Sequence, residues 1–195
     1  MQQCTEGYEQ LFVRGEKECP EGMARKTAYL GLMCAAALIL SYIESLIPFF
    51  AGIPGMKLGL PNAAVVTVLY LYSWKEAALV NLVRILAVSF IFGNVFSMAY
   101  SVSGAALSLL CMQLMKRTGR FSTAGVSVAG GIAHNAGQVI IAAAVVENVR
   151  IGYYFIPLAI AGVVTGALIG LTAGLIIPRL KPLADMNKNK NSEEM

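Results

Sequence analysis

The 195-residue chain contains few charged side chains, one histidine and one aspartate, and each shortage excludes a class of function. Charged residues make up 13% of the chain, about half the share of an ordinary soluble domain, whereas 57% are hydrophobic and the mean hydropathy is +0.66. His134 and Asp185 supply neither a pair of metal-binding histidines nor a carboxylate cluster for Mg²⁺. We therefore expect no metal, no cofactor and no catalytic activity of the chain's own.

Motifs that bind nucleotides are also missing. The sequence has no G-x-x-x-x-G-K-[ST] phosphate loop, and no two of its 19 glycines stand two positions apart, as a G-x-G turn requires. Its four cysteines form no C-x-x-C pair, so neither a zinc site nor a disulfide framework is expected. Transport driven by ATP would therefore need a separate ATPase subunit.

Long apolar runs fill the chain between Thr27 and Ile177. A membrane-spanning helix needs roughly 20 such residues, so the sequence predicts an all-α polytopic membrane protein with about six transmembrane helices. We expect this membrane domain over residues 27–178, between a cytoplasmic N-terminal segment (1–26) and a disordered cytoplasmic tail (179–195). The six spans are placed near 27–47, 58–72, 77–92, 95–115, 123–146 and 154–177. The second and third are short, which leaves open five spans with one re-entrant hairpin.

Basic residues are unevenly distributed between the predicted loops. The outer loops hold only Lys57 and Arg150, whereas the inner segments collect Arg14, Lys17, Arg25, Lys26, Lys75, Lys116, Arg117, Arg120, Arg179, Lys181, Lys188 and Lys190. The positive-inside rule then places both ends of the chain inside. Because these residues are scattered over short loops without interleaved aromatic residues, the net charge of +4 indicates topology and no nucleic-acid partner.

Ionisable side chains interrupt two of the apolar spans. Glu44 lies near the outer end of the first span, and Asn81 and Arg84 share one face of the third. An arginine near the middle of the membrane costs roughly 2.5 to 3.5 kcal/mol on insertion scales, so Arg84 is expected to face the protein interior. A structural Glu44–Arg84 ion pair and a ligand site both fit this pattern, and we favour the ligand site. Lys57 adds positive charge that favours an anionic small-molecule substrate, although a plain connecting turn is the alternative.

The fifth predicted span carries three polar residues on one sector, His134, Asn135 and Gln138. We predict that Asn135 and Gln138 face an outward-open pocket together with Arg84. His134 is expected to lie deeper and to bridge helices, because a lone neutral histidine in a membrane helix usually does so.

Small residues at four-residue spacing predict close helix packing. Glycines recur down one face of the sixth span, at Gly162, Gly166, Gly170 and Gly174. Such a face lets a neighbouring backbone approach closely. Gly31 and Ala35 form a similar but weaker face on the first span.

The segments "KLGLPNAAVVTVLYLY", "LVRILAVSFIFG" and "VAGGIAHNAGQ" resemble a small bacterial membrane family catalogued both as heptaprenyl diphosphate synthase component I and as the Gx transporter family. That family is in turn similar to the substrate-capture (S) components of energy-coupling factor importers. Those proteins have six helices, both ends inside, an outward pocket and no ATPase of their own. The resemblance implies a multi-pass bundle in the bacterial cell membrane, with an energy-coupling ATPase module as its partner. Gly31 and Ala35 match the A-x-x-x-A docking face of S components only approximately.

The two names of this family imply different functions. The transporter name implies a lipid-embedded subunit that captures a small molecule or vitamin for an importer, and we adopt this interpretation. The synthase name implies a membrane subunit associated with a polyprenyl (heptaprenyl) diphosphate synthase of isoprenoid or quinone biosynthesis. Such synthases use two aspartate-rich motifs, and this chain has only Asp185, so that subunit would be non-catalytic.

Overall fold

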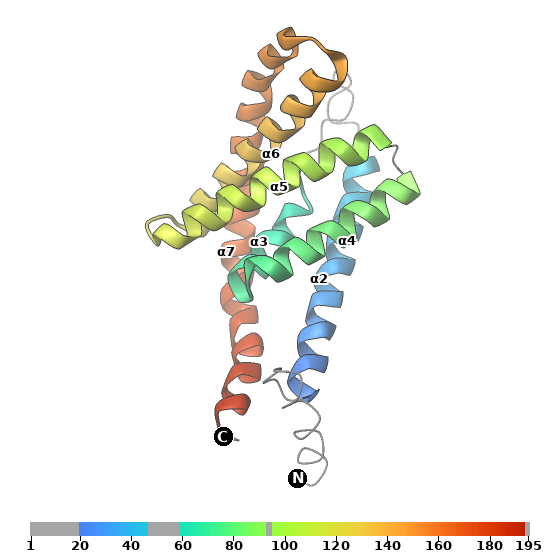
Figure 1. Cartoon of the computed structure of the whole chain (residues 1–195). Helices are drawn as coiled ribbons and strands as arrows, with labels where there is room; N and C mark the ends of the chain where they lie inside the picture. Colours follow the sequence, from blue (N-terminus) through green and yellow to red (C-terminus); the bar gives the residue numbers. More distant parts are fainter. Residues whose placement is uncertain (1–19, 47–58, 93–94, 194–195) are drawn as a thin grey trace, which may run out of the picture.

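The computed structural model describes residues 20–46, 59–92 and 95–193, and these residues form helices and no strand. The helices in chain order are α2 (Pro20–Leu46), α3 (Asn62–Leu71), α4 (Trp74–Phe92), α5 (Val95–Thr118), α6 (Thr123–Val146), the short 3₁₀ helix η1 (Val149–Tyr154) and α7 (Phe155–Glu193) (Figure 1). The all-α class expected from the sequence is confirmed for this part of the chain. Lys57 and most of the predicted loop around it lie outside the described residues.

In the part of the chain that the structure describes, four helical segments are long and apolar enough to cross a membrane, namely Ala24–Glu44, Val95–Thr118, Thr123–Val146 and Val149–Pro182. They identify the chain as a multi-pass membrane protein. The other two helices that coincide with predicted spans differ from these four. α3 has only 10 residues and is therefore about 15 Å long, half the thickness of a bilayer core. α4 is long enough but carries three charged residues, Lys75, Glu76 and Arg84.

The short helix α3 forms the centre of the bundle. Its side chains are almost all apolar, and Val65, Val66, Val68 and Leu69 are fully buried. α2, α4 and α7 pack around it, as its central position in Figure 1 shows. Isolated helices of this length are marginal in water, so α3 owes its stability to this enclosure.

Glycines bring α6 into backbone contact with both of its neighbours, α5 and α7. A Cβ built on Gly137 would lie 2.8 Å from the Cα of Gly104 on α5. On the α7 side, a Cβ built on Gly131 would lie 2.5 Å from the carbonyl oxygen of Gly162. Side chains at these positions would force the helices apart, so the glycines permit the closest packing in the described bundle.

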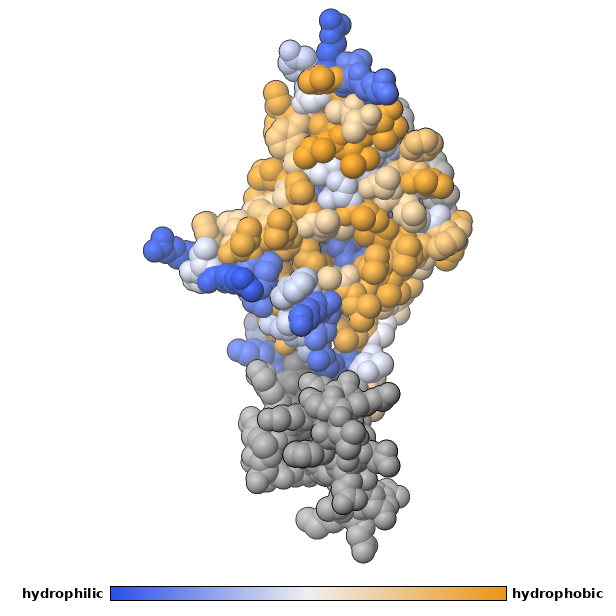
Figure 2. Space-filling view, viewed as in Figure 1, coloured by the Kyte–Doolittle hydropathy of each residue, from blue (hydrophilic) through white to orange (hydrophobic). Residues whose placement is uncertain are grey.

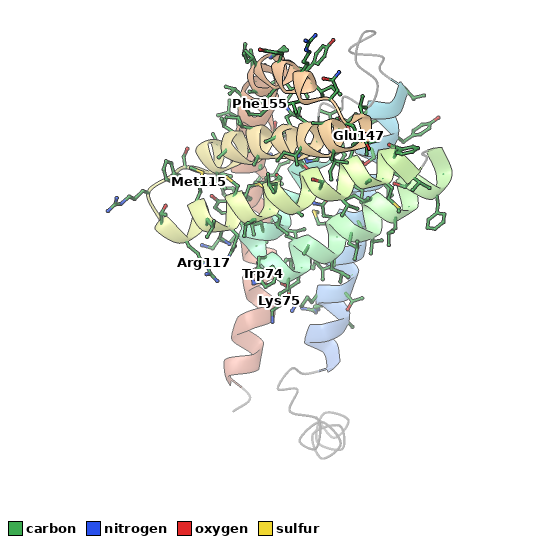
Figure 3. All side chains as sticks on the ribbon, turned by 45° about the horizontal axis from the view of Figure 1, so that its top comes forward. Trp74, Lys75, Met115, Arg117, Glu147 and Phe155 are labelled. Carbon is green, nitrogen blue, oxygen red and sulfur yellow. The ribbon has the colours of Figure 1, made fainter. Side chains whose placement is uncertain are left out.

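The surface of the bundle is apolar over most of its height, with charged groups towards its ends (Figure 2). Large side chains such as Phe90 (85% exposed) and Leu175 (70% exposed) point outward and match a lipid environment. The start of α2 and the end of α7 lie at the same end of the molecule, at the bottom of Figure 1. In Figure 3, Lys75 and Arg117 lie towards this end, whereas Glu147 and Phe155 lie away from it.

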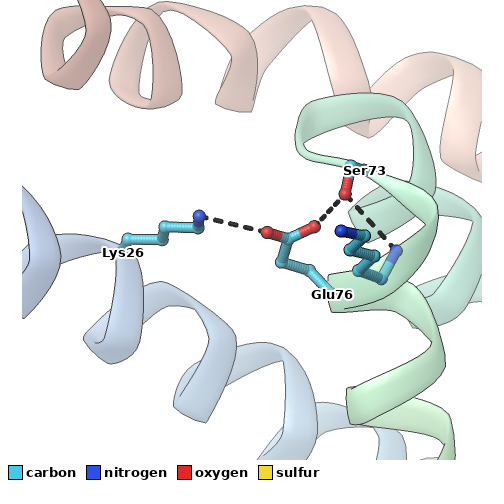
Figure 4. A network of polar contacts seen from close by, with 4 residues as sticks. Lys26, Ser73 and Glu76 are labelled. Atoms are coloured by element: carbon cyan, nitrogen blue, oxygen red, sulfur yellow. Dashed lines mark hydrogen bonds and ion pairs between the residues drawn. The ribbon is translucent and has the colours of Figure 1, made fainter. Parts of the chain in front are cut away.

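A polar network at this basic end joins α2 to the turn between α3 and α4 (Figure 4). Lys26 Nζ lies 3.0 Å from Glu76 Oε1, and the Ser73 hydroxyl donates to Glu76 Oε2. Burial alone would raise the pKa of Glu76, but the hydrogen bonds from Ser73 and Lys26 and the charge of Lys26 outweigh it and hold the pKa below its usual value. The network ties the helix ends together at the start of α4.

α7 is much longer than a single span requires. It continues as helix to Glu193, although it contains Pro178 and Pro182, and its 39 residues extend over roughly 58 Å. Residues 179–193, for which the sequence suggested a disordered tail, are therefore helical in the structure. The segment of α7 that is apolar enough to cross a membrane ends at Pro182.

Candidate functional site

A polar cavity lies between α3, α5, α6 and α7, within the membrane-spanning part of the bundle. Its volume is about 10 Å³, enough for a single water molecule. Polar side chains from all four helices line it, and the glycines of α6 and α7 form part of its wall; the lining residues include Asn62, Ser108, Ser127, His134, Asn135, Thr165, Gly130, Gly131 and Gly166. A polar void of this kind is unusual in a bundle that faces lipid, since each uncompensated polar group there is costly.

The polar side chains of the cavity wall differ in whether they form hydrogen bonds within the protein. The Asn135 amide donates from Nδ2 to the Leu158 carbonyl at 2.6 Å and so bridges α6 to α7. The Thr165 hydroxyl donates to the Ala161 carbonyl within its own helix, at 2.9 Å. Ser108 Oγ, in contrast, is buried and has no hydrogen-bond partner among the described residues. One hydroxyl in the wall thus keeps its hydrogen-bonding capacity for something inside the cavity.

His134 lies at the cavity wall and is held from two sides. Gln138, one turn further along α6, forms a hydrogen bond between its Nε2 and His134 Nε2, across 3.1 Å. On the α5 side, a Cβ built on Gly104 would lie 2.9 Å from His134 Cε1. The ring therefore fills the space that the missing side chain of Gly104 leaves, and it positions α5 against α6.

A second polar cluster lies between α2 and α4. Arg84 is 7% exposed and donates from Nη2 to Asn81 Oδ1 at 2.7 Å, while its Nε is buried without a hydrogen-bond partner among the described residues. Glu44 on α2 is also buried and interacts electrostatically with Arg84. Cys34 adds a weak thiol hydrogen bond to the Val80 carbonyl, at 3.8 Å.

Gly59 connects the two clusters. Its backbone N–H donates to Glu44 Oε1, and the same residue lines the cavity. Its φ is +81°, a backbone conformation that glycine adopts at little energetic cost. A Cβ built on Gly59 would lie 3.0 Å from Asn62 Nδ2. A series of polar groups thus leads from the α2–α4 cluster to the cavity, through Arg84, Glu44, Gly59 and Asn62.

The structure distributes the predicted site residues over these two clusters. Asn135 and His134 line the cavity, whereas Gln138 bonds to His134 and is absent from the lining. Arg84 and Asn81 lie together on α4, in the second cluster. Sequence reasoning missed Asn62, Ser127 and Thr165, because single amides and hydroxyls in apolar helices are common and usually bond to their own backbone.

The glycine faces also divide into packed and open positions. Gly162, Gly166 and Gly170 contact α6, whereas neither Gly174 nor Gly31 has an atom of another element within 4 Å of a built Cβ. Ala35, one turn from Gly31, is exposed. Among the described residues no three His, Cys, Asp or Glu side chains gather as a metal site would require.

The family model described as heptaprenyl diphosphate synthase component I matches residues 33–176, which include both polar clusters, the whole of α3, α4, α5 and α6, and parts of α2 and α7. Neither a curated protein nor a solved structure matches the chain.

Proposed function

The chain belongs to the heptaprenyl diphosphate synthase component I family, and we propose that it is a membrane subunit that captures a small molecule in the cavity between α3, α5, α6 and α7. In this proposal it works as the S component of an importer, and a separate ATPase module supplies the energy. The observation that carries the proposal is Ser108 Oγ, a buried hydroxyl that borders a polar cavity inside a membrane bundle and has no hydrogen-bond partner in the part of the chain that the structure describes. Keeping such a group unsatisfied is costly unless a ligand or a water molecule satisfies it.

The small volume of the cavity determines how a molecule could enter it. Space for one water molecule is too small for a metabolite, so capture requires the wall helices to separate. The wall favours such a movement where Gly131 and Gly166 meet backbone atoms of the neighbouring helix, with no side chains between them. We propose that the structure corresponds to a closed form of the site.

Native mass spectrometry of the protein in mild detergent, together with ligand-dependent thermal stability, tests this proposal. Wild-type protein is expected to retain a small molecule, and Ser108→Ala should weaken its binding roughly tenfold, as loss of one hydrogen bond to a polar group does. Thr172→Ala is the matched control, because Thr172 is exposed and bonds only to Leu168 of its own helix. Protein that never carries a small molecule, or equal effects of the two substitutions, would contradict capture.

The family description supports a second candidate function. "Component I" of a synthase implies a second component, and we propose as the alternative that this chain anchors a separate prenyl diphosphate synthase at the membrane. Affinity purification of the tagged chain from its native cells distinguishes the two. A co-purifying prenyl synthase whose activity falls when the membrane subunit is removed supports anchoring, whereas a co-purifying ATPase module supports capture.

A further inference from the structure

We infer that Arg84 recognises an anionic group, a carboxylate or a phosphate, on the small molecule that the cavity admits. This inference deepens the proposed function and rests on it, because it assigns the chemical class of the captured ligand. It concerns the cluster between α2 and α4, which lies beside the cavity. None of the described α4 side chains lines the cavity itself.

The guanidinium of Arg84 has donors to spare. An arginine side chain carries five N–H donors, and with the described residues Arg84 forms one hydrogen bond, to Asn81 Oδ1. Its Nε is buried and has no acceptor among the described residues, and the whole residue is 7% exposed. A cation that is removed from water and leaves a donor unused has the greatest gain from a bound anion.

Glu44 does not take the place of that anion. Arg84 forms no ion pair with a described residue, although the charge of Glu44 acts on it. One oxygen of Glu44 instead accepts the backbone N–H of Gly59. The Glu44 carboxylate therefore holds the backbone of Gly59 at the cavity wall, and the Arg84 guanidinium stays available for another acceptor.

The position of Arg84 suits one end of an elongated ligand. Asn81 lies one turn before Arg84 on the same face of α4 and fixes the orientation of the guanidinium. Gly59 and Asn62 then lead from this cluster to the cavity. Planar guanidinium groups bind carboxylate and phosphate oxygens through two parallel hydrogen bonds, which a halide ion cannot form. A ligand with such a group at one end and a neutral polar part at the other matches both clusters.

Thermal stability of the purified protein, titrated with sodium acetate, sodium phosphate or sodium chloride at constant ionic strength, tests the inference. Wild type should be stabilised saturably by acetate or phosphate and not by chloride. Arg84→Gln should weaken this effect at least tenfold, since a bidentate hydrogen-bonded contact is lost. Arg150→Gln, which removes an exposed arginine, should leave the effect unchanged. If Arg84→Gln fails to fold, Arg84→Lys keeps the charge without the planar fork and should bind more weakly than wild type.

Two results would overturn the inference: no saturable effect of either oxyanion on wild type, or the same effect on wild type and Arg84→Gln. Repeating the titration in nanodiscs separates a lipid source from a soluble one. If a lipid phosphate occupies Arg84, the response to added phosphate should vanish in phosphatidylglycerol and persist in phosphatidylcholine.

Failure of the proposed function gives a different pattern. If a retained small molecule binds Arg84→Gln as tightly as wild type, capture stands and the role of Arg84 is wrong. If no small molecule is retained and Ser108→Ala is silent, while oxyanions still stabilise wild type through Arg84, capture is wrong and only the anion site remains.

Discussion

Buried hydroxyls and amides in this bundle satisfy their hydrogen bonds in two ways. Ser41 and Thr67 donate to the carbonyl four residues earlier in their own helix, at 2.8 Å each, which makes them inexpensive in an apolar environment. Asn135 and Ser103 instead reach another helix. Ser108 and Arg84 depart from both patterns, because each keeps a buried polar atom that no described residue hydrogen-bonds. That contrast is the reason for placing ligand recognition at these two residues.

Gly170 and Gly174 provide a matched test of backbone packing on one helix face. A Cβ at Gly170 would lie 2.5 Å from the Cα of Ala124, whereas a Cβ at Gly174 would meet nothing within 4 Å. Gly170→Ala should therefore destabilise the protein by about 1 to 3 kcal/mol through overpacking. Gly174→Ala should be neutral or stabilising by up to about 1 kcal/mol, because alanine favours helix. Thermal unfolding in detergent measures both, and equal effects would contradict the α6–α7 contact.

The sequence predicted the glycine face of α7 but not where the contact ends. Spacing places Gly162, Gly166, Gly170 and Gly174 on one face, because four residues make about one turn. Whether each glycine meets a neighbour depends on the neighbour's length. α6 begins at Thr123, beside Gly170, so Gly174 lies one turn past the start of α6. The end of the contact depends on where α6 begins, and the four-residue spacing of the glycines in α7 alone could not predict it.

At the scale of elements, α3 shows that an apolar run does not by itself distinguish a buried helix from a membrane span. The sequence placed a span near 58–72, and the structure has a helix of 10 residues that begins after Pro61 and ends before Ser73. A buried core helix and a lipid-spanning helix have the same composition, since both are apolar on all sides. Only the surrounding helices α2, α4 and α7 identify α3 as interior. The bounds of α4, α5 and α6 agree with the predicted spans to within a few residues, whereas α2 begins earlier and α7 ends later than the sequence predicted.

Lys116 on α5 stabilises the C-terminal end of α3. Its Nζ donates to the Leu69 carbonyl at 2.5 Å and lies 5.1 Å from the centre of the Tyr70 ring. The last carbonyls of a helix lack partners within the helix and carry partial negative charge, so a cation there is favourable. Lys116→Met, which keeps the length of the side chain, should lower the free energy of unfolding by about 1 to 2 kcal/mol.

Arg117→Met is the control for this prediction, because Arg117 is the next residue and is also basic. Unlike the partly buried Lys116, it is exposed. It should change the free energy of unfolding by less than about 0.5 kcal/mol. Chemical or thermal denaturation followed by circular dichroism measures both variants. A loss that is as large for Arg117→Met would show that the basic end acts through overall charge and not through the contact with α3.

At the scale of the whole molecule, the fold brings together residues that the sequence separates widely. The start of α2 and the end of α7 lie at one end, and Lys75 and Arg117 lie towards the same end (Figures 1 and 3). Arg150 lies in η1, which joins α6 to α7 at the opposite end of the molecule (Figure 1). The asymmetry agrees with the distribution of basic loops in the sequence. The arrangement of the ends is therefore fixed by the fold, and the positive-inside rule predicts which end faces the cytoplasm.

Cysteine labelling tests this orientation and the number of crossings together. In a background without the four native cysteines, Phe121→Cys and Gly152→Cys place thiols on the two sides of α6; Phe121 is 50% exposed, and a Cβ at Gly152 meets nothing within 4 Å. A membrane-impermeant maleimide applied to intact cells should label Gly152→Cys and spare Phe121→Cys, and both should react after lysis. Lys75→Cys, which is exposed at the α3–α4 turn, should behave as Phe121→Cys does. The opposite pattern would invert the topology. Labelling of both Phe121→Cys and Gly152→Cys from outside would mean that α6 does not cross, and labelling of Lys75→Cys alone would mean that α3 and α4 enter the membrane as a pair from the other side.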